Sequence, residues 1–106
     1  MAYLRNMPNL IFMAPSDTNE LKDMLEFAIS QNRPVAIRYP KGCATAIPRP
    51  TEQIQFGKSR ILKDGKDLAI ISIGSMAGIA FDTAKLLQKK KVSTMVIDAR
   101  FIKPID

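Results

Sequence analysis

Residues 34–42 read Pro-Val-Ala-Ile-Arg-Tyr-Pro-Lys-Gly, and this stretch decides how the fold is interpreted. Val35–Ile37 is a short, apolar and partly β-branched run, which is typical of a strand buried on both faces of a parallel sheet. Pro40 has no backbone N–H to donate to a neighbouring strand, so the strand ends before it. The stretch therefore predicts a buried strand of an α/β sheet that stops abruptly at a loop.

Two cations flank this stop, Arg38 at the end of the strand and Lys41 beyond it. Open α/β sheets bind ligands beyond the carboxyl ends of their strands, which makes both residues candidates for anion binding. The guanidinium of Arg38 offers a planar fork for a carboxylate or phosphate, whereas the ammonium of Lys41 is a flexible point charge. Gly42 permits a tight turn that would present a backbone N–H. In the alternative interpretation, Arg38 pairs with a nearby acid and Lys41 is only solvated.

A strand and a helix are expected before this stretch. Leu10–Ala14 is an apolar run ended by Pro15, which predicts a second buried strand. Asp17 is expected to cap the following helix, with Glu20 adding negative charge to its first turn. The helix has one apolar face, spaced i, i+3, i+4, formed by Leu21, Met24, Leu25, Ala28 and Ile29. Strand, helix and strand together predict a βαβ crossover.

A second unit of the same kind begins at Asp67. Leu68–Ile73 is expected to be a buried strand, and the turn at Gly74 leads into a helix. Ser75 is interpreted as a plain N-cap of this helix, with anion binding by the free N–H groups of the turn as the alternative. The helical residues expected to face inward are Ile79, Ala80, Thr83, Ala84, Leu86 and Leu87. Val92–Asp98 returns as another buried run.

Between the two units, residues 44–66 are polar and contain prolines, which is typical of a linker. A short edge strand is expected within Gly57–Leu62. Asp98 and Arg100, at the end of the last strand, are interpreted as partners in structural ion pairs, and the methionines at 13, 24, 76 and 95 as core residues. The predicted fold class is α/β, with two partial βαβ units of parallel strands joined by a linker.

Composition narrows the class of protein. The chain has 106 residues, 46% of them hydrophobic and 25% charged, as expected for a globular protein. The net charge is +6, but the basic residues are scattered along the chain and are not interleaved with aromatic residues. This distribution argues against nucleic acid as a partner. No apolar run is long enough for a membrane span. The chain lacks histidine, so no His-based general base, triad or zinc site is expected. A single cysteine, Cys43, fits a reducing compartment, and the protein is predicted to be soluble and intracellular.

Several motifs together resemble one family. Tyr3–Arg5, Met13–Asp17, Asn19–Leu21, Arg38–Gly42 and Ala99–Asp106 occur in the order and spacing of the 1-deoxy-D-xylulose-5-phosphate synthase family, a transketolase-like group that depends on thiamine diphosphate. The resemblance runs along essentially the whole chain. It implies that residues 1–43 are the end of a pyrimidine-binding domain, 44–66 a linker, and 67–106 the start of a transketolase C-terminal domain.

The resemblance also implies a function. The family condenses pyruvate with glyceraldehyde 3-phosphate, releasing carbon dioxide, in non-mevalonate isoprenoid synthesis, and it works as a homodimer in the cytoplasm or in plastids. An arginine of its Arg-Tyr-Pro-Arg-Gly motif helps to hold the substrate phosphate, and Lys41 occupies that position here, with Arg38 as a second candidate. The residues that bind thiamine diphosphate and magnesium lie upstream in the family. No catalytic, cofactor-binding or metal residue is therefore expected in this chain, which should be inactive alone.

Two alternatives stay open. The chain would also fit another transketolase-like enzyme, such as a 2-oxo acid dehydrogenase β subunit. It would otherwise be a non-catalytic module that associates with itself through its incomplete sheet edges.

Overall fold

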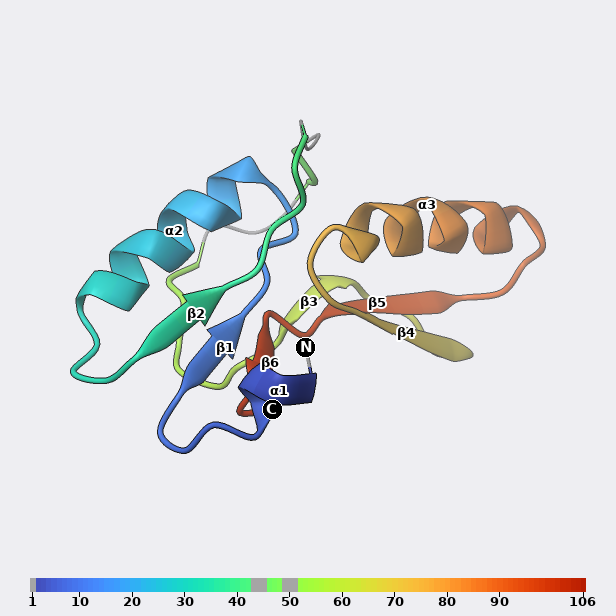
Figure 1. Ribbon diagram of the computed structural model, residues 1–106. Helices are drawn as coiled ribbons and strands as arrows, with labels where there is room; N and C mark the ends of the chain where they lie inside the picture. Colours follow the sequence, from blue (N-terminus) through green and yellow to red (C-terminus); the bar gives the residue numbers. More distant parts are fainter. Residues whose placement is uncertain (1, 43–45, 49–51) are drawn as a thin grey trace.

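The computed structural model describes residues 2–42, 46–48 and 52–106. Within these ranges the elements are α1 (Ala2–Arg5), β1 (Ile11–Met13), α2 (Thr18–Ile29), β2 (Val35–Ile37), β3 (Arg60–Lys63), β4 (Leu68–Ser72), α3 (Met76–Lys89), β5 (Thr94–Asp98) and β6 (Phe101–Lys103). They form two three-stranded sheets, ordered β2-β1-β6 and β3-β5-β4. Figure 1 shows one long helix over each sheet. We call β1, β2, β6 and α2 the first lobe, and β3, β4, β5 and α3 the second lobe.

The two lobes share one plan. In the first lobe β1 runs parallel to β2, with α2 between them in the chain, and in the second lobe β4 runs parallel to β5, with α3 between them. Each sheet gains one antiparallel strand, β6 on β1 and β3 on β5. The α/β prediction, with two βαβ units of parallel strands, is therefore confirmed.

The chain passes from the second lobe back to the first at a sharp turn between β5 and β6. The N–H of Ala99 still donates to the carbonyl of Ser72 (2.8 Å), whereas the carbonyl of Arg100 already accepts from the N–H of Ala14 (2.9 Å). Arg100 has a φ of 57°, in the left-handed region, which reverses the chain within one residue. Gly74 of the second lobe packs closely against Ala14 of the first lobe. A Cβ on this glycine would lie 3.2 Å from the Cβ of Ala14, which is a tight contact.

The first lobe has a closed core. All of Leu10–Ala14 is buried, as predicted, and the core consists of Ile11, Met13, Met24 and Phe101. Burial of Val35–Ile37 on both faces was predicted but is wrong, because β2 is an edge strand and its residues are only half-buried. On α2, the face toward the sheet is centred on Met24, so Leu25 and Ile29 are exposed although their spacing predicted burial.

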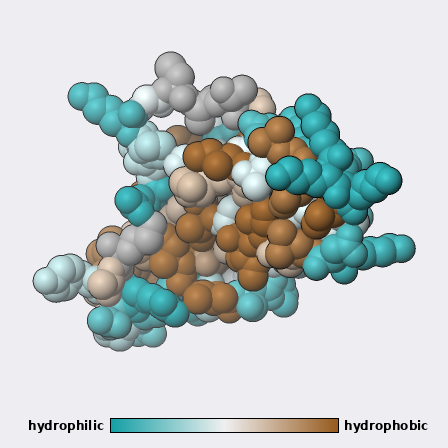
Figure 2. Space-filling model, turned by 90° about the vertical axis from the view of Figure 1, so that its right-hand side faces the viewer, coloured by the Kyte–Doolittle hydropathy of each residue, from teal (hydrophilic) through white to brown (hydrophobic). Residues whose placement is uncertain are grey.

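The second lobe has a much smaller core, formed by Ala80, Ala84 and Val96. The prediction that Leu68–Ile73 is buried is wrong: β4 is a sheet edge, and Ile71 is 71% exposed. Helix α3 contacts its sheet through a narrow alanine stripe, which leaves the apolar residues Met76, Ile79 and Leu86 exposed instead of buried. In Figure 2, apolar side chains gather in the middle of the face formed by this end of the molecule.

Two further predictions concern the capping residues at the starts of α2 and α3. Asp17 caps α2 as expected, since its carboxylate accepts the N–H of Glu20 (2.8 Å). Ser75 precedes α3 but its hydroxyl makes no capping hydrogen bond, because its backbone is already helical (φ −57°) rather than extended. Among the helices of the described ranges, none is long and apolar enough to cross a bilayer.

Candidate functional site

A small hollow of about 70 Å³ lies where β1, β2 and β4 end at their carboxyl sides. One wall is the turn from Pro15 to Thr18, which leads from β1 into α2, and the other is formed by Tyr39, Pro40 and Gly42, which follow β2. Ser75 of the second lobe completes the lining. The position agrees with the rule that open α/β sheets bind ligands beyond the carboxyl ends of their strands.

The two predicted cations lie beside this hollow. Lys41 stands between two of its lining residues, Pro40 and Gly42, and its side chain is exposed. Arg38 is exposed as well, and its backbone N–H extends the sheet by donating to the carbonyl of Met13 (2.9 Å). The alternative in which Arg38 pairs with an acid is not seen within residues 2–42, 46–48 and 52–106. Cys43, which follows Gly42, lies outside the described residues.

A larger hollow of about 870 Å³ lies between α2 on one side and Ile47, Pro48 and Glu52–Ile54 on the other. Its lining includes the acids Asp23, Glu26 and Glu52. A phosphate would meet like charge there, so the hollow at the carboxyl ends of the strands is the better candidate for an anionic substrate.

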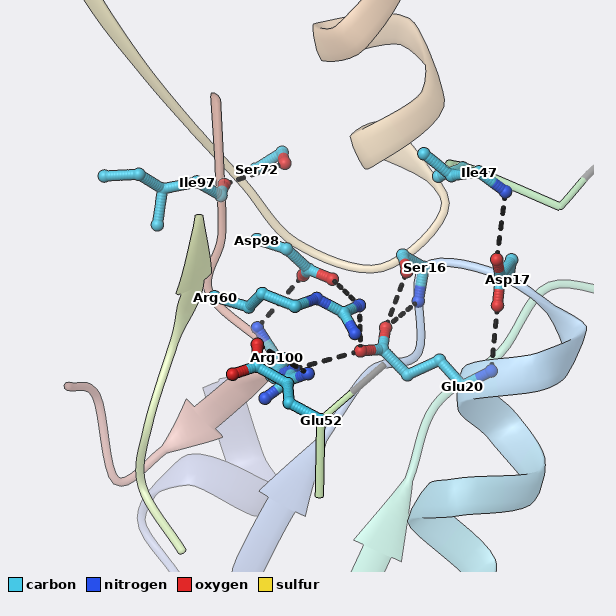
Figure 3. A network of polar contacts seen from close by, with 10 residues as sticks. All are labelled: Ser16, Asp17, Glu20, Ile47, Glu52, Arg60, Ser72, Ile97, Asp98 and Arg100. Atoms are coloured by element: carbon cyan, nitrogen blue, oxygen red, sulfur yellow. Dashed lines mark hydrogen bonds and ion pairs between the residues drawn. The ribbon is translucent and has the colours of Figure 1, made fainter. Parts of the chain in front are cut away.

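A buried charged cluster joins the two lobes behind the small hollow, and Figure 3 shows its members converging. Glu20 of α2 lies at its centre. Its Oε1 accepts from Nη2 of Arg60 (2.5 Å) and from Nε of Arg100 (3.1 Å). Asp98 lies opposite Arg60 across the β3–β5 ladder, where its Oδ2 is 3.4 Å from Nη2 of Arg60, and its Oδ1 accepts the N–H of Arg100 (3.1 Å). All four side chains are at least 98% buried.

The two buried carboxyls differ in their acidity. Burial raises the pKa of Glu20, but hydrogen bonds from the hydroxyl and N–H of Ser16 and the charge of Arg60 outweigh burial, so the pKa is lowered overall. Burial and the neighbouring carboxylate of Glu20 raise the pKa of Asp98 to about 7. The two acids thus form a pair in which Glu20 stays ionised, whereas Asp98 holds its proton up to near neutral pH.

Sequence reasoning identified half of this cluster. Of the two predicted pairings, that of Arg100 with another carboxylate is confirmed, because Arg100 pairs with Glu20. Asp98 instead pairs with Arg60 and accepts only the backbone N–H of Arg100. Glu20 was interpreted only as an acid that favours the helix N-terminus, and Arg60 was placed on an edge strand without a role. No local pattern connects residues 40 positions apart; the only signal was an acid at the first turn of a helix that also carries the buried residue Met24.

The described residues do not fit a metal centre. Within residues 2–42, 46–48 and 52–106, no group of three or more His, Cys, Asp or Glu side chains is placed to hold a metal ion. No step that uses magnesium or the diphosphate of a cofactor is therefore assigned to them.

Comparison with known families defines the class. The transketolase pyrimidine-binding domain matches residues 1–45, and the transketolase C-terminal domain matches residues 57–106. A "Split gene transketolase, inactive beta4 tetramer" has a TM-score of 0.93 and 30% identity over 99% of this chain, which covers 35% of that chain. The chain therefore belongs to the transketolase family, whose enzymes depend on thiamine diphosphate.

Within that family, the chain is similar to several curated 1-deoxy-D-xylulose-5-phosphate synthases. That of Syntrophomonas wolfei is 49% identical over 99% of the chain, and that of Symbiobacterium thermophilum is 42% identical over all of it. The resemblance seen in the sequence motifs is thus confirmed. The chain spans 17% of the length of each of these relatives and corresponds to a segment of such a synthase.

Proposed function

We propose that the chain works as part of a 1-deoxy-D-xylulose-5-phosphate synthase, which joins pyruvate to glyceraldehyde 3-phosphate with loss of carbon dioxide. The identity of 49% with the Syntrophomonas wolfei synthase, which extends along 99% of the chain, supports this activity over that of a 2-oxo acid dehydrogenase or a non-catalytic module. The remainder of the enzyme would supply the cofactor and metal ligands.

Within that enzyme, Lys41 and Arg38 are the residues that hold the phosphate of glyceraldehyde 3-phosphate. The observation that carries this assignment is the exposed Lys41 between two residues that line the hollow at the carboxyl ends of β1 and β2. Lys41 has no carboxylate partner among the residues that the structure describes, so its charge stays available for a phosphate. Arg38 lies at the end of β2, three residues earlier, and offers a second positive charge.

The remaining assignments follow from the same proposal. Residues 1–43 act as the end of the pyrimidine-binding domain, 44–66 as the linker and 67–106 as the start of the C-terminal domain. Thiamine diphosphate and magnesium are cofactors of the whole enzyme, which forms a homodimer in the cytoplasm, or in plastids of a plant-type source. Gel filtration of the whole enzyme tests the dimer, and a monomer would contradict it.

A chimeric enzyme tests the activity. The matched segment of the Syntrophomonas wolfei synthase is replaced by this chain, and the formation of 1-deoxy-D-xylulose 5-phosphate is measured. We expect an active chimera. A folded chimera that binds thiamine diphosphate but makes no product would contradict the proposed activity.

Lys41→Ala in this chimera tests the site. A charged hydrogen bond contributes about 1.5–3 kcal/mol, so the KM for glyceraldehyde 3-phosphate should rise about 10- to 100-fold, with the KM for pyruvate unchanged. Lys41→Arg should preserve or lower that KM, since a guanidinium binds phosphate with two parallel hydrogen bonds. Lys22→Ala removes an exposed charge from α2 and is the control. An unchanged KM in Lys41→Ala would remove Lys41 from the site.

A further inference from the structure

Glu20 is buried with no exposed surface although it lies in the first turn of α2, where acids usually face solvent. Its two carboxylate oxygens have separate partners. Oε2 accepts both the N–H of Ser16 (2.7 Å) and the hydroxyl of Ser16 (2.6 Å), whereas Oε1 accepts from Arg60 and Arg100. Oε2 thus holds the turn between β1 and α2, whereas Oε1 is held by Arg60 of the second lobe and by Arg100 of the turn between β5 and β6.

The turn that Oε2 holds is a wall of the small hollow. Ser16 and Asp17 line it on one side, opposite the residues that flank Lys41. Asp17 carries the connection further, because its Oδ1 accepts the N–H of Glu20 (2.8 Å) and its Oδ2 accepts the N–H of Ile47 (3.0 Å). The start of α2 is therefore held both to the turn that lines the hollow and to the backbone at Ile47.

Oε1, the other carboxylate oxygen of Glu20, accepts hydrogen bonds from the guanidiniums of Arg60 and Arg100, which have few other partners. Within the described part of the chain, Nε and Nη1 of Arg60 and Nη2 of Arg100 make no hydrogen bond, although Nη2 of Arg100 lies 3.6 Å from a carboxylate oxygen of Glu52. Loss of the Glu20 charge would leave both arginines poorly compensated in the interior. Their side chains would then shift, and the carboxylate that orients Ser16 would lose its support.

We propose that Glu20 is a positioning residue for substrate: braced by Arg60 and Arg100, its carboxylate fixes the Ser16–Asp17 turn and thereby the width of the hollow beside Lys41. This inference rests on the proposed function, in which Lys41 meets the substrate phosphate. It adds that the second lobe, through Arg60 of β3, contributes to the affinity of a site formed mainly by the first lobe. Glu20 acts through the turn and needs no contact with substrate.

Glu20→Gln in the chimeric synthase tests the proposal, because the amide keeps the shape of the side chain but loses the charge that both arginines need. We expect the KM for glyceraldehyde 3-phosphate to rise about tenfold, equivalent to one charged contact. The KM for pyruvate and kcat should change less than about twofold. Glu26→Gln, the same change at an exposed position of α2, is the control and should leave all three constants unchanged.

A double-mutant cycle separates positioning from simple loss of stability. If Glu20 acts by aligning the hollow with Lys41, then adding Glu20→Gln to Lys41→Ala should change the KM for glyceraldehyde 3-phosphate less than about twofold. A further tenfold increase in the double variant would overturn the proposal, as would equal changes in both KM values. A silent Lys41→Ala would instead refute the proposed function.

Ser16→Ala provides a second route if Glu20→Gln does not fold. It removes only the hydroxyl bond to Oε2 and leaves the buried charges paired. The KM for glyceraldehyde 3-phosphate should rise about threefold, with the KM for pyruvate unchanged. An unchanged KM in a folded Ser16→Ala variant would overturn the proposal.

Discussion

The two lobes have the same arrangement of strands and yet bury their apolar residues very differently. In the first lobe Ile11, Met13, Met24 and Phe101 are each at most 1% exposed. In the second lobe the core consists of two alanines and one valine, while Ile71 is 71% exposed. Phe101 belongs to β6, which follows the second lobe in sequence and pairs with the first lobe in space. The core of the first lobe is therefore completed by β6, a strand that comes after the second lobe in the sequence.

The comparison shows that apolar spacing predicts an element but not its burial. A strand is buried only when both its edges and its faces are covered, and β4 has a free edge in the sheet order β3-β5-β4. The second lobe leaves Ile71, Ile79 and Leu86 exposed, and Figure 2 shows apolar side chains gathered on this face. The following variants test the difference between the lobes in order of expected effect.

The largest effect is expected from Phe101→Ala. The ring of Phe101 makes edge-to-face contacts with Phe27 and Phe56, at centroid distances of 6.0 and 6.1 Å. Truncation of a buried phenylalanine costs about 3–5 kcal/mol, a large part of the stability of a small domain. Urea unfolding of the 106-residue chain measures the change in the free energy of unfolding.

Ile71→Ala is the matched variant in the second lobe. Because this side chain is mostly exposed, its truncation should change the free energy of unfolding by less than about 0.5 kcal/mol. Equal losses in Phe101→Ala and Ile71→Ala would show that the second lobe buries its apolar face in solution, and the contrast drawn above would be wrong.

A change of pH should have an intermediate effect on the free energy of unfolding, because two acids of the buried charged cluster have shifted pKa values. The pKa of Asp98 is raised from 3.8 to about 7, so the folded state holds a proton that the unfolded state releases. Stability should therefore fall as the pH rises from about 4 to about 7, by at most about 1.4 kcal/mol per pH unit. The pKa of Glu20 is lowered from 4.5, so its contribution is present above that value and is lost as the pH falls through the folded-state pKa. Between these two opposing slopes, stability should be greatest near about pH 4.

Asp98→Asn should remove the decline between pH 4 and pH 7, since the amide does not titrate. Urea unfolding at several pH values measures it. Asp82→Asn makes the same change at an exposed position of α3 and should leave the pH profile as it was. A decline that persists in Asp98→Asn would assign the pH dependence to another group.

The sequence predicted those features that depend on local spacing. The βαβ units, the buried run at Leu10–Ala14 and the cap at Asp17 each follow from residues within a few positions of one another. The pairing of β6 with β1 and the contact between Glu20 and Arg60 connect residues 40 or more positions apart, where spacing carries no information. Burial of Ile79 and Leu86 was also mispredicted, because a helix can rest on its sheet through a narrow alanine stripe.

The position of the candidate site was predictable for a related reason. A proline that ends a strand marks the carboxyl edge of the sheet, and Lys41 follows Pro40 directly. The opposite wall was not predicted, because Ser16 donates to Glu20, and Glu20 is held by two arginines 40 and 80 positions further along the chain.

The smallest expected effect distinguishes the two helix starts. The carboxylate of Asp17 caps α2 and also accepts the N–H of Ile47, so Asp17→Ala should lower the free energy of unfolding by about 1–2 kcal/mol. Ser75→Ala should lower it by less than about 0.5 kcal/mol, since its hydroxyl makes no capping bond and the residue is exposed. Asp17→Asn keeps an oxygen acceptor and should restore most of the loss, which separates capping from charge. If Ser75→Ala were as costly as Asp17→Ala, the hydroxyl would be capping α3 in solution, and the two lobes would begin their helices in the same way.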